Sequence, residues 1–533
     1  MTFLRTQAYV LALSLCVSLC GVAQAQESLG EIARKVRESK KSLVRLSEQD
    51  ARALFASMDK VMEFSEKDSG FPKRAAVQRK LIGREELEQR MKKAASDRAA
   101  EQRLFESEVV LKKFGLLPAG FSLKHYLAND TAKQLGGFYD AESKTMFLLN
   151  WIPIDDQQAI MAHELTHALQ DQNYDLMRYF KGGVKDADAA PKMSAGAVDS
   201  DEKASAKRAA IEGQATIVFF NYMLREYGAN LSSTPGAINF VRDQIAAEAP
   251  MVVKDAPLLL REGMLFPYKQ GMDFELELLK RGGRAMAFQR PFSDPPANTH
   301  EVLQPESYFK HVKPKLQGIP DLSSVLSPAF VAYDSGSIGE FDIEIMAQQF
   351  GRKDDVFSVA RFWDGGAYVA VKRSDIPADA TLTTADLALI YVSKWKSRDA
   401  AERFAEIYAN ALPERVVVQK ETPVRRVECE TACDKVIWEK RLLTSEGMAR
   451  VEVTGRNTVV ITQGLDDEMF AKVRPLLVSE SRTGAAMGAQ DELSMRLFGS
   501  PGFVAMAEQV RRELSNSVGR SLKTWAASQP KGE

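Results

Sequence analysis

Residues 162–172 read AHELTHALQDQ and place two histidines, His163 and His167, four positions apart. The residues around them are mostly apolar, so we predict a largely buried helix from about residue 156 to residue 172, with an aspartate as its N-cap. Residues four apart lie on one face of a helix, one turn from each other, so both imidazoles can point at a single metal ion. The chain has only five histidines, which makes this spacing the most informative feature of the sequence.

Glu164 follows the first histidine directly. From this position its carboxylate can reach a water on a metal ion without being a ligand itself. A catalytic zinc site has three protein ligands and one open position, and a neighbouring glutamate takes a proton from the water that the metal polarises. The H-E-x-x-H pattern indicates this chemistry. The alternative is a chance spacing, in which case the buried histidines need other hydrogen-bonding partners.

Glu212 is the candidate third ligand, 45 positions after His167. It is an isolated acid in the stretch AAIEGQAT (209–216), on a second helix that we predict from about residue 203 to residue 227. An unpaired carboxylate on such an apolar helix is costly unless a cation faces it, and a zinc ion on the preceding helix is such a cation. The alternative is an ion pair with Arg208 or with an arginine elsewhere.

This combination of residues resembles the gluzincin group of zinc metallopeptidases. More narrowly, HELTHALQDQ and the downstream IEGQAT resemble a little-characterised family of exported bacterial zinc-dependent peptidase-like proteins. The similarity continues in residues 257–283 and 295–308 and covers roughly residues 110–310. The zinc motif is its most specific part.

The resemblance implies a zincin-like fold, a bound Zn²⁺ and a peptide or protein substrate. It also implies that TMFLLN (145–150) is a strand at the edge of the cleft, where an extended substrate pairs with it. The implied zinc ligands are His163, His167 and Glu212, with Glu164 as the general base.

The chain departs from the family's pattern within PPANTHEVLQPESY (295–308), where the family has P-x-S-T-E-Q-x-L-H-P-E-x-Y. The four differing positions are Asn298, His300, Glu301 and Gln304, which replace Ser, Glu, Gln and His. Roles that the family assigns to these four positions are therefore not carried over.

Three further residues are candidates for supporting roles. Asp171, four positions after His167, is placed to accept a hydrogen bond from a ligand imidazole, or it is a surface acid near the end of its helix. Tyr268 and His300 are candidate donors to a tetrahedral oxyanion. The alternatives are that Tyr268 is a packed aromatic residue and that His300 is a loop residue.

The N-terminus is typical of a secretory signal peptide, because Arg5 precedes an apolar run (8–23) and Ala23-Gln24-Ala25 is a small-x-small site. We therefore predict a signal peptide over residues 1–25 and an exported protein, periplasmic or secreted. A retained anchor is the alternative, although the run is short for a membrane span, which needs roughly 20 apolar residues. The nearest later candidate, ATIVFFNYML (215–224), is shorter still.

Two of the four cysteines lie in the predicted signal peptide, and Cys429 and Cys433 remain. Strand-like sequence flanks both, and no histidine or further cysteine is near. An oxidising compartment favours a structural disulfide between them, with metal or redox chemistry as the alternative. Removal of residues 1–25 loses only Arg5 among the charged residues, so the formal charge becomes 70 − 72 = −2. This near-neutral balance indicates no nucleic-acid partner.

About 500 residues are too many for a single core, so several domains are expected. Residues 26–110 are rich in charged residues and alanine and predict helices, whereas residues 111–315 hold the zinc motif and a predicted hairpin (136–150). Residues 320–533 mix amphipathic helices with strand-like segments. We expect an α+β protein: a zincin-like metallopeptidase domain, mainly helical with a small sheet, followed by an α+β C-terminal domain.

Two functions fit these patterns. The first is an exported zinc metallopeptidase in which Glu164 activates a water and then delivers the proton to the leaving amine. The second is a non-catalytic exported zinc-binding envelope protein whose region beyond residue 320 binds a partner. A fourth protein ligand that closes the zinc site would favour the second function, since structural zinc sites have four.

Overall fold

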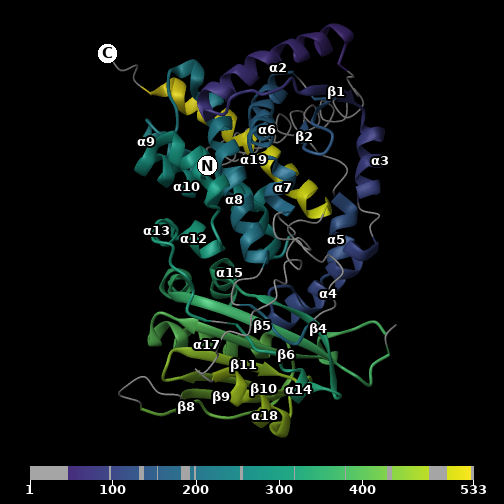
Figure 1. Ribbon diagram of the computed structural model, residues 1–533, viewed down its shortest axis with the longest axis vertical. Coiled ribbons are helices and arrows are strands. Elements are labelled where there is room, and N and C mark those ends of the chain that lie inside the picture. Colours follow the sequence, from purple (N-terminus) through teal and green to yellow (C-terminus); the bar gives the residue numbers. More distant parts are fainter. Residues whose placement is uncertain are drawn as a thin grey trace, which may run out of the picture.

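The computed structural model describes residues 46–94, 98–130, 137–152, 154–181, 192–196, 200–252, 256–316, 318–377, 380–428, 435–478 and 501–529. The predicted signal peptide (1–25) and the predicted disulfide between Cys429 and Cys433 lie outside these residues. The described chain forms a helical half with a small sheet and a second half built on a large sheet (Figure 1). The protein is therefore α+β, as the sequence predicts.

The helical half consists mostly of residues before α14 (Ser323–Leu326) and also includes α19 (Pro501–Ser528) from the end of the chain. Its helices, in chain order, are α2 (Glu48–Ser69), α3 (Arg84–Ala94), α4 (Arg98–Phe114), α5 (Leu123–Asp130), α6 (Ile154–Tyr174), α7 (Leu176–Lys181), α8 (Ser200–Leu224), the 3-10 helix η1 (Arg225–Tyr227), α9 (Pro235–Val252), α10 (Leu258–Phe288), α11 (Arg290–Ser293), α12 (Thr299–Leu303), α13 (Pro305–Phe309) and α19.

The two motif-bearing helices, α6 and α8, pack against each other, and α2 covers α6. α6 begins at Ile154, two residues before the predicted start, so the aspartates expected at its N-cap lie within its first turn. α8 continues through η1 to Gly228, whose φ of 66° ends the segment in the left-handed conformation that glycine favours. Within the described residues, no helix is both long and apolar enough to cross a bilayer. The apolar stretch 215–224 instead forms part of the buried core.

The small sheet has three strands, β1 (Gln78–Ile82), β2 (Phe138–Asp140) and β3 (Thr145–Leu149), in the order β1-β3-β2. β2 and β3 form the predicted hairpin, and β1 pairs with β3 in parallel. β3 carries the sequence expected at the cleft edge, but it is the central strand with a neighbour on each side. The prediction of TMFLLN as the edge strand is therefore wrong, and β2 has that position. β1 also places a strand inside region 26–110, which was predicted as helical.

The second half surrounds an eight-stranded antiparallel sheet in the order β4-β5-β6-β11-β10-β9-β7, with β8 paired to β9. Its elements are α14 (Ser323–Leu326), β4 (Phe330–Ser337), α15 (Glu340–Phe350), α16 (Asp355–Val359), η2 (Ala360–Phe362), β5 (Trp363–Arg373), η3 (Thr384–Asp386), β6 (Leu387–Trp395), α17 (Arg398–Ala411), η4 (Leu412–Glu414), β7 (Val418–Glu421), β8 (Arg425–Arg426), β9 (Val436–Thr444), β10 (Gly447–Thr454), β11 (Thr458–Gln463) and α18 (Asp467–Val478).

Helices cover both faces of the large sheet. α17 packs on β6, β10 and β11, while α18 contacts β11 and α14. Alternate residues of β6 serve the two cores: Leu389 and Tyr391 join the core shared with the helical half, whereas Ile390 and Val392 join the separate core on the other face. Burial on both faces explains why the central strands are almost continuously apolar.

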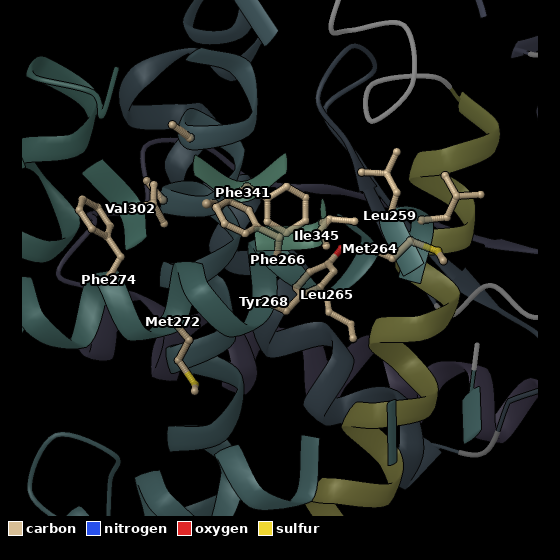
Figure 2. Close-up of a cluster of buried hydrophobic side chains, with 14 of the residues drawn as sticks. Leu259, Met264, Leu265, Phe266, Tyr268, Met272, Phe274, Val302, Phe341 and Ile345 are labelled. Carbon is tan, nitrogen blue, oxygen red and sulfur yellow. The ribbon is translucent and has the colours of Figure 1, made fainter. Parts of the chain in front are cut away.

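Several contacts join the halves, among them those of α12 with α15 and of α4 with β4. Figure 2 shows an apolar cluster in which α10 residues meet α15, and the rings of Phe266 and Phe341 lie 4.7 Å apart there. The helix α19, drawn in yellow in Figure 1, follows the large sheet in the chain but packs on α8, α9 and α10 of the helical half. The end of the chain thus belongs to the helical half, which differs from the predicted division at residue 320.

Candidate metal centre

His163 and His167 on α6 face Glu212 on α8. The Nε2 atoms of the two histidines lie 3.0 and 3.3 Å from Oε2 of Glu212, respectively, and 3.0 Å from each other. Ligand atoms at ordinary zinc distances in a tetrahedron lie about 3.3 Å apart. Two imidazole nitrogens and one carboxylate oxygen are also a donor set that zinc prefers. The donor atoms and their spacing therefore fit a Zn²⁺ ion.

Opposite charges on Glu212 and the two imidazoles offset the cost of burying these three groups together. Burial tends to raise the pKa of the Glu212 carboxyl, but the His167 and His163 imidazoles hold that pKa well below its ordinary value. Burial tends to lower the pKa of His167, but the Glu212 carboxylate raises it to about 9. In the metal-free protein a proton thus supplies the positive charge between these groups, and a metal ion would displace it. Glu212 faces imidazoles, not Arg208, the partner in the alternative ion pair.

Gln170 orients His167, a role that the sequence analysis did not assign. The Nδ1–H of His167 donates to Oε1 of Gln170 over 2.7 Å. This bond directs Nε2 of His167 at Glu212, so Nε2 is the nitrogen that a metal ion would take after displacing the proton. Gln170 is held in turn by α8, because its Nε2 donates to the Ile211 carbonyl at 3.0 Å and to Gln214 Oε1 at 2.9 Å. The sequence contains a signal for this role, because Gln170 and Gln214 each interrupt an apolar helix face close to a candidate ligand.

Asp171 does not accept from a ligand imidazole. Its carboxylate accepts from the Tyr139 hydroxyl at 2.7 Å, from Lys144 Nζ at 2.7 Å and from the Leu176 backbone N–H at 3.1 Å. Tyr139 and Lys144 belong to the β2–β3 hairpin, so Asp171 fixes this hairpin to the end of α6. The orienting role predicted for Asp171 is filled by its neighbour Gln170.

Glu164 lies between the ligand histidines and the small sheet. Its Oε2 accepts the backbone N–H of Tyr139 over 2.9 Å. This N–H belongs to β2, the strand at the edge of its sheet, so the edge of β2 faces Glu164. The Glu164 carboxylate also contributes to the raised pKa of His167, which places its charge at the centre. Glu164, the residue expected to act as the base, therefore lies beside the candidate ligands His163 and His167.

Tyr268 and His300 have different surroundings. Tyr268, on α10, is buried, and its ring centroid lies 6.3 Å from that of His163. The structure thus brings Tyr268 to the metal centre, as a packed aromatic residue. His300 is not in an exposed loop: it is buried on α12, with Glu340, Ser307 and Lys396 as partners. None of these partners belongs to the metal centre, so the structure does not support an oxyanion role for His300 there.

Within the described part of the chain, one group of residues is close enough to hold a metal ion: His163, His167 and Glu212. Their potential ligand atoms all lie within 4.8 Å of one another. Three ligands leave one position for a water or a substrate. Comparisons of the chain with protein families, curated proteins and solved structures gave no match.

Proposed function

We propose that this chain is an exported zinc-dependent metallopeptidase. The observation that carries the proposal is the convergence of His163, His167 and Glu212 from two helices, with Glu164 beside them. When bound, zinc would supply the positive charge that acidifies a water and polarises a carbonyl. Three ligands and an adjacent carboxylate favour this function over a structural zinc site, which needs a fourth ligand and no base.

Residues of the chain would carry out the proton transfers, position the substrate and stabilise the oxyanion. Glu164 takes a proton from the attacking water and gives it to the leaving amine, which converts the amide to a carboxylic acid and an amine. The backbone N–H of Tyr139 holds the Glu164 carboxylate in place. β2 lies at the edge of its sheet, and an extended peptide substrate would form backbone hydrogen bonds along this edge next to the N–H of Tyr139, which Glu164 occupies. Tyr268, beside His163, is the candidate donor to the developing oxyanion.

The test uses residues 26–533 purified with zinc and incubated with a diverse peptide library, with new termini read by mass spectrometry. We expect cuts by the wild type and at least a 100-fold loss of rate in Glu164→Gln, because general acid–base catalysis contributes about 10²–10⁴-fold. Glu164→Gln should retain zinc, since Glu164 is not a ligand. Glu48→Gln, whose side chain is 93% exposed, is the matched control.

Two results would contradict the proposal. One is equal cleavage by the wild type and Glu164→Gln. The other is an absence of cuts by wild-type protein that holds one zinc ion per chain, which would favour the non-catalytic envelope protein.

A further inference from the structure

The segment where the chain departs from the family pattern builds a second polar cluster. Asn298 Oδ1 accepts the Glu301 N–H at 3.0 Å, and Glu301 Oε2 accepts the Ala297 N–H at 2.7 Å, so both side chains cap α12. Thr299 ties the same turn to α8, because its N–H and hydroxyl both donate to Glu202 over 2.8 Å. The residue that follows, His300, is therefore held on a short helix whose start is fixed on two sides.

His300 lies between a carboxylate and a hydroxyl. Its Nδ1 is bonded to Oε2 of Glu340, the fully buried first residue of α15. Gln304 Nε2 donates to the other Glu340 oxygen at 3.0 Å and fixes the carboxylate. A carboxylate can only accept, so the imidazole donates from Nδ1, and its Nε2 carries the lone pair. The Ser307 hydroxyl lies 3.0 Å from this Nε2 and can donate to it.

We propose that Ser307, His300 and Glu340 form a second catalytic site, separate from the metal centre, that cleaves acyl esters. The three side chains have the order hydroxyl, imidazole and carboxylate, and His300 is in hydrogen-bond contact with both Ser307 and Glu340. This is the arrangement that activates a serine nucleophile, and it recurs on unrelated folds. The site uses no metal, so it extends beyond the proposed peptidase activity and does not depend on it.

The surroundings of Ser307 meet the other needs of such a site. His300 and Glu340 are buried, whereas Ser307 is partly buried and Lys396 is exposed, so a substrate would approach from the side of Ser307 and Lys396. Lys396 Nζ lies 2.8 Å from the same Nε2, so its ammonium shares this acceptor with the Ser307 hydroxyl until a substrate carbonyl takes the positive charge. We expect an ester as the substrate, because an alcohol leaves with less help from an acid than an amine does.

The reaction balances with water as the second reactant. The Ser307 hydroxyl proton moves to His300 Nε2 while Oγ forms a bond to the acyl carbon. The alcohol departs with that proton, and the acyl group remains on Ser307. A water then gives a proton to His300 Nε2, attacks the acyl carbon and releases the carboxylic acid, with the proton returned to Ser307.

The test is labelling of residues 26–533 with a fluorophosphonate probe in the presence of a zinc chelator, so that the metal centre does not contribute. We expect an adduct on Ser307, mapped by mass spectrometry, and its loss in Ser307→Ala. Ser293→Ala is the matched control, because Ser293 Oγ donates only to a backbone carbonyl, at 3.1 Å, and should not affect labelling. Thermal unfolding of each variant shows that the loss does not come from misfolding.

A second variant separates catalysis from a structural link between the two halves. Glu340→Gln keeps the shape of the side chain but removes the charge that supports His300, and it should slow labelling at least tenfold in protein that remains folded. An unlabelled Ser307 in folded wild-type protein would overturn the proposal. Labelling of equal rate in wild type and folded Glu340→Gln would overturn it as well.

Discussion

At the scale of single residues, two neighbours on α6, Gln170 and Asp171, have different tasks although they are adjacent in the sequence. Gln170 accepts from His167, whereas Asp171 accepts from the β2–β3 hairpin. Helix geometry explains the difference: Gln170 points toward α8, and Asp171 points toward the sheet. The sequence analysis proposed Asp171 for the role of Gln170. Asp171 is four positions after His167, and carboxylates are common partners of ligand imidazoles.

This difference leads to a paired prediction. Gln170→Ala should weaken zinc binding about 10–100-fold, as the loss of a residue that orients a ligand typically does. Asp171→Asn should leave zinc affinity within about threefold of wild type, since it lacks contact with the imidazoles, but it should lower the melting temperature because Lys144 loses its charged partner. Competition with a chromophoric chelator measures the affinities. A larger loss of affinity in Asp171→Asn than in Gln170→Ala would show that the assignment is reversed.

At the scale of elements, α8 and α10 approach each other where both have glycine. A Cβ on Gly213 would lie 2.3 Å from the backbone carbonyl of Gly271, and a Cβ on Gly271 would lie 2.1 Å from the Ala209 carbonyl oxygen. Glycine is needed here for close approach of the two backbones. The contact also fixes the position of the adjacent candidate ligand Glu212, so helix packing and the geometry of the candidate metal centre depend on the same residues.

Gly213→Ala should therefore destabilise the protein by about 1–3 kcal/mol, the usual cost of overpacking, and should weaken zinc binding in the same variant. Gly120→Ala is the control, because nothing lies within 4 Å of its added Cβ. Urea denaturation of the metal-free proteins gives the stabilities. Equal unfolding midpoints for the two variants would mean that α10 moves aside without cost.

The sequence predicts elements best where one pattern dominates. The helices α6 and α8 were expected from their apolar residues, and the mixture of helices and strands beyond residue 320 was expected from its amphipathic and strand-like segments. β4 was missed because its sequence FVAYDSGS lacks alternation: Asp334 is fully buried there and accepts from Tyr368. β1 was missed because four of its five residues are exposed or partly exposed, so burial leaves little trace in the sequence.

At the scale of the whole molecule, the end of the chain closes the helical half. Val518 and Leu522 of α19 are fully buried, and Trp525 stacks on Phe240 of α9 with ring centroids 5.5 Å apart. A Cβ on Gly519 would lie 2.7 Å from Met223 of α8, the helix that carries Glu212. The last helix therefore supports the helices behind the metal centre.

Val518→Asp should destabilise the helical half by about 3 kcal/mol or more, because it buries a charge without a partner. Lys523→Ala, at an exposed position on the same helix, should unfold like the wild type. Limited proteolysis followed by mass spectrometry identifies which half becomes accessible first. First cuts confined to the large sheet of Val518→Asp would contradict this role of α19.

The sequence alone determined the α+β class and selected His163, His167 and Glu212, which the structure brings together, because period and spacing depend on local helix geometry. The four-residue step of His163 and His167 needs nothing beyond a helix, and the isolation of Glu212 can be read along the chain. The tertiary structure decided which residue orients His167, which strand lies at the sheet edge and where α19 packs. These features depend on which surfaces meet across long separations in the chain, and neither spacing nor composition contains that information.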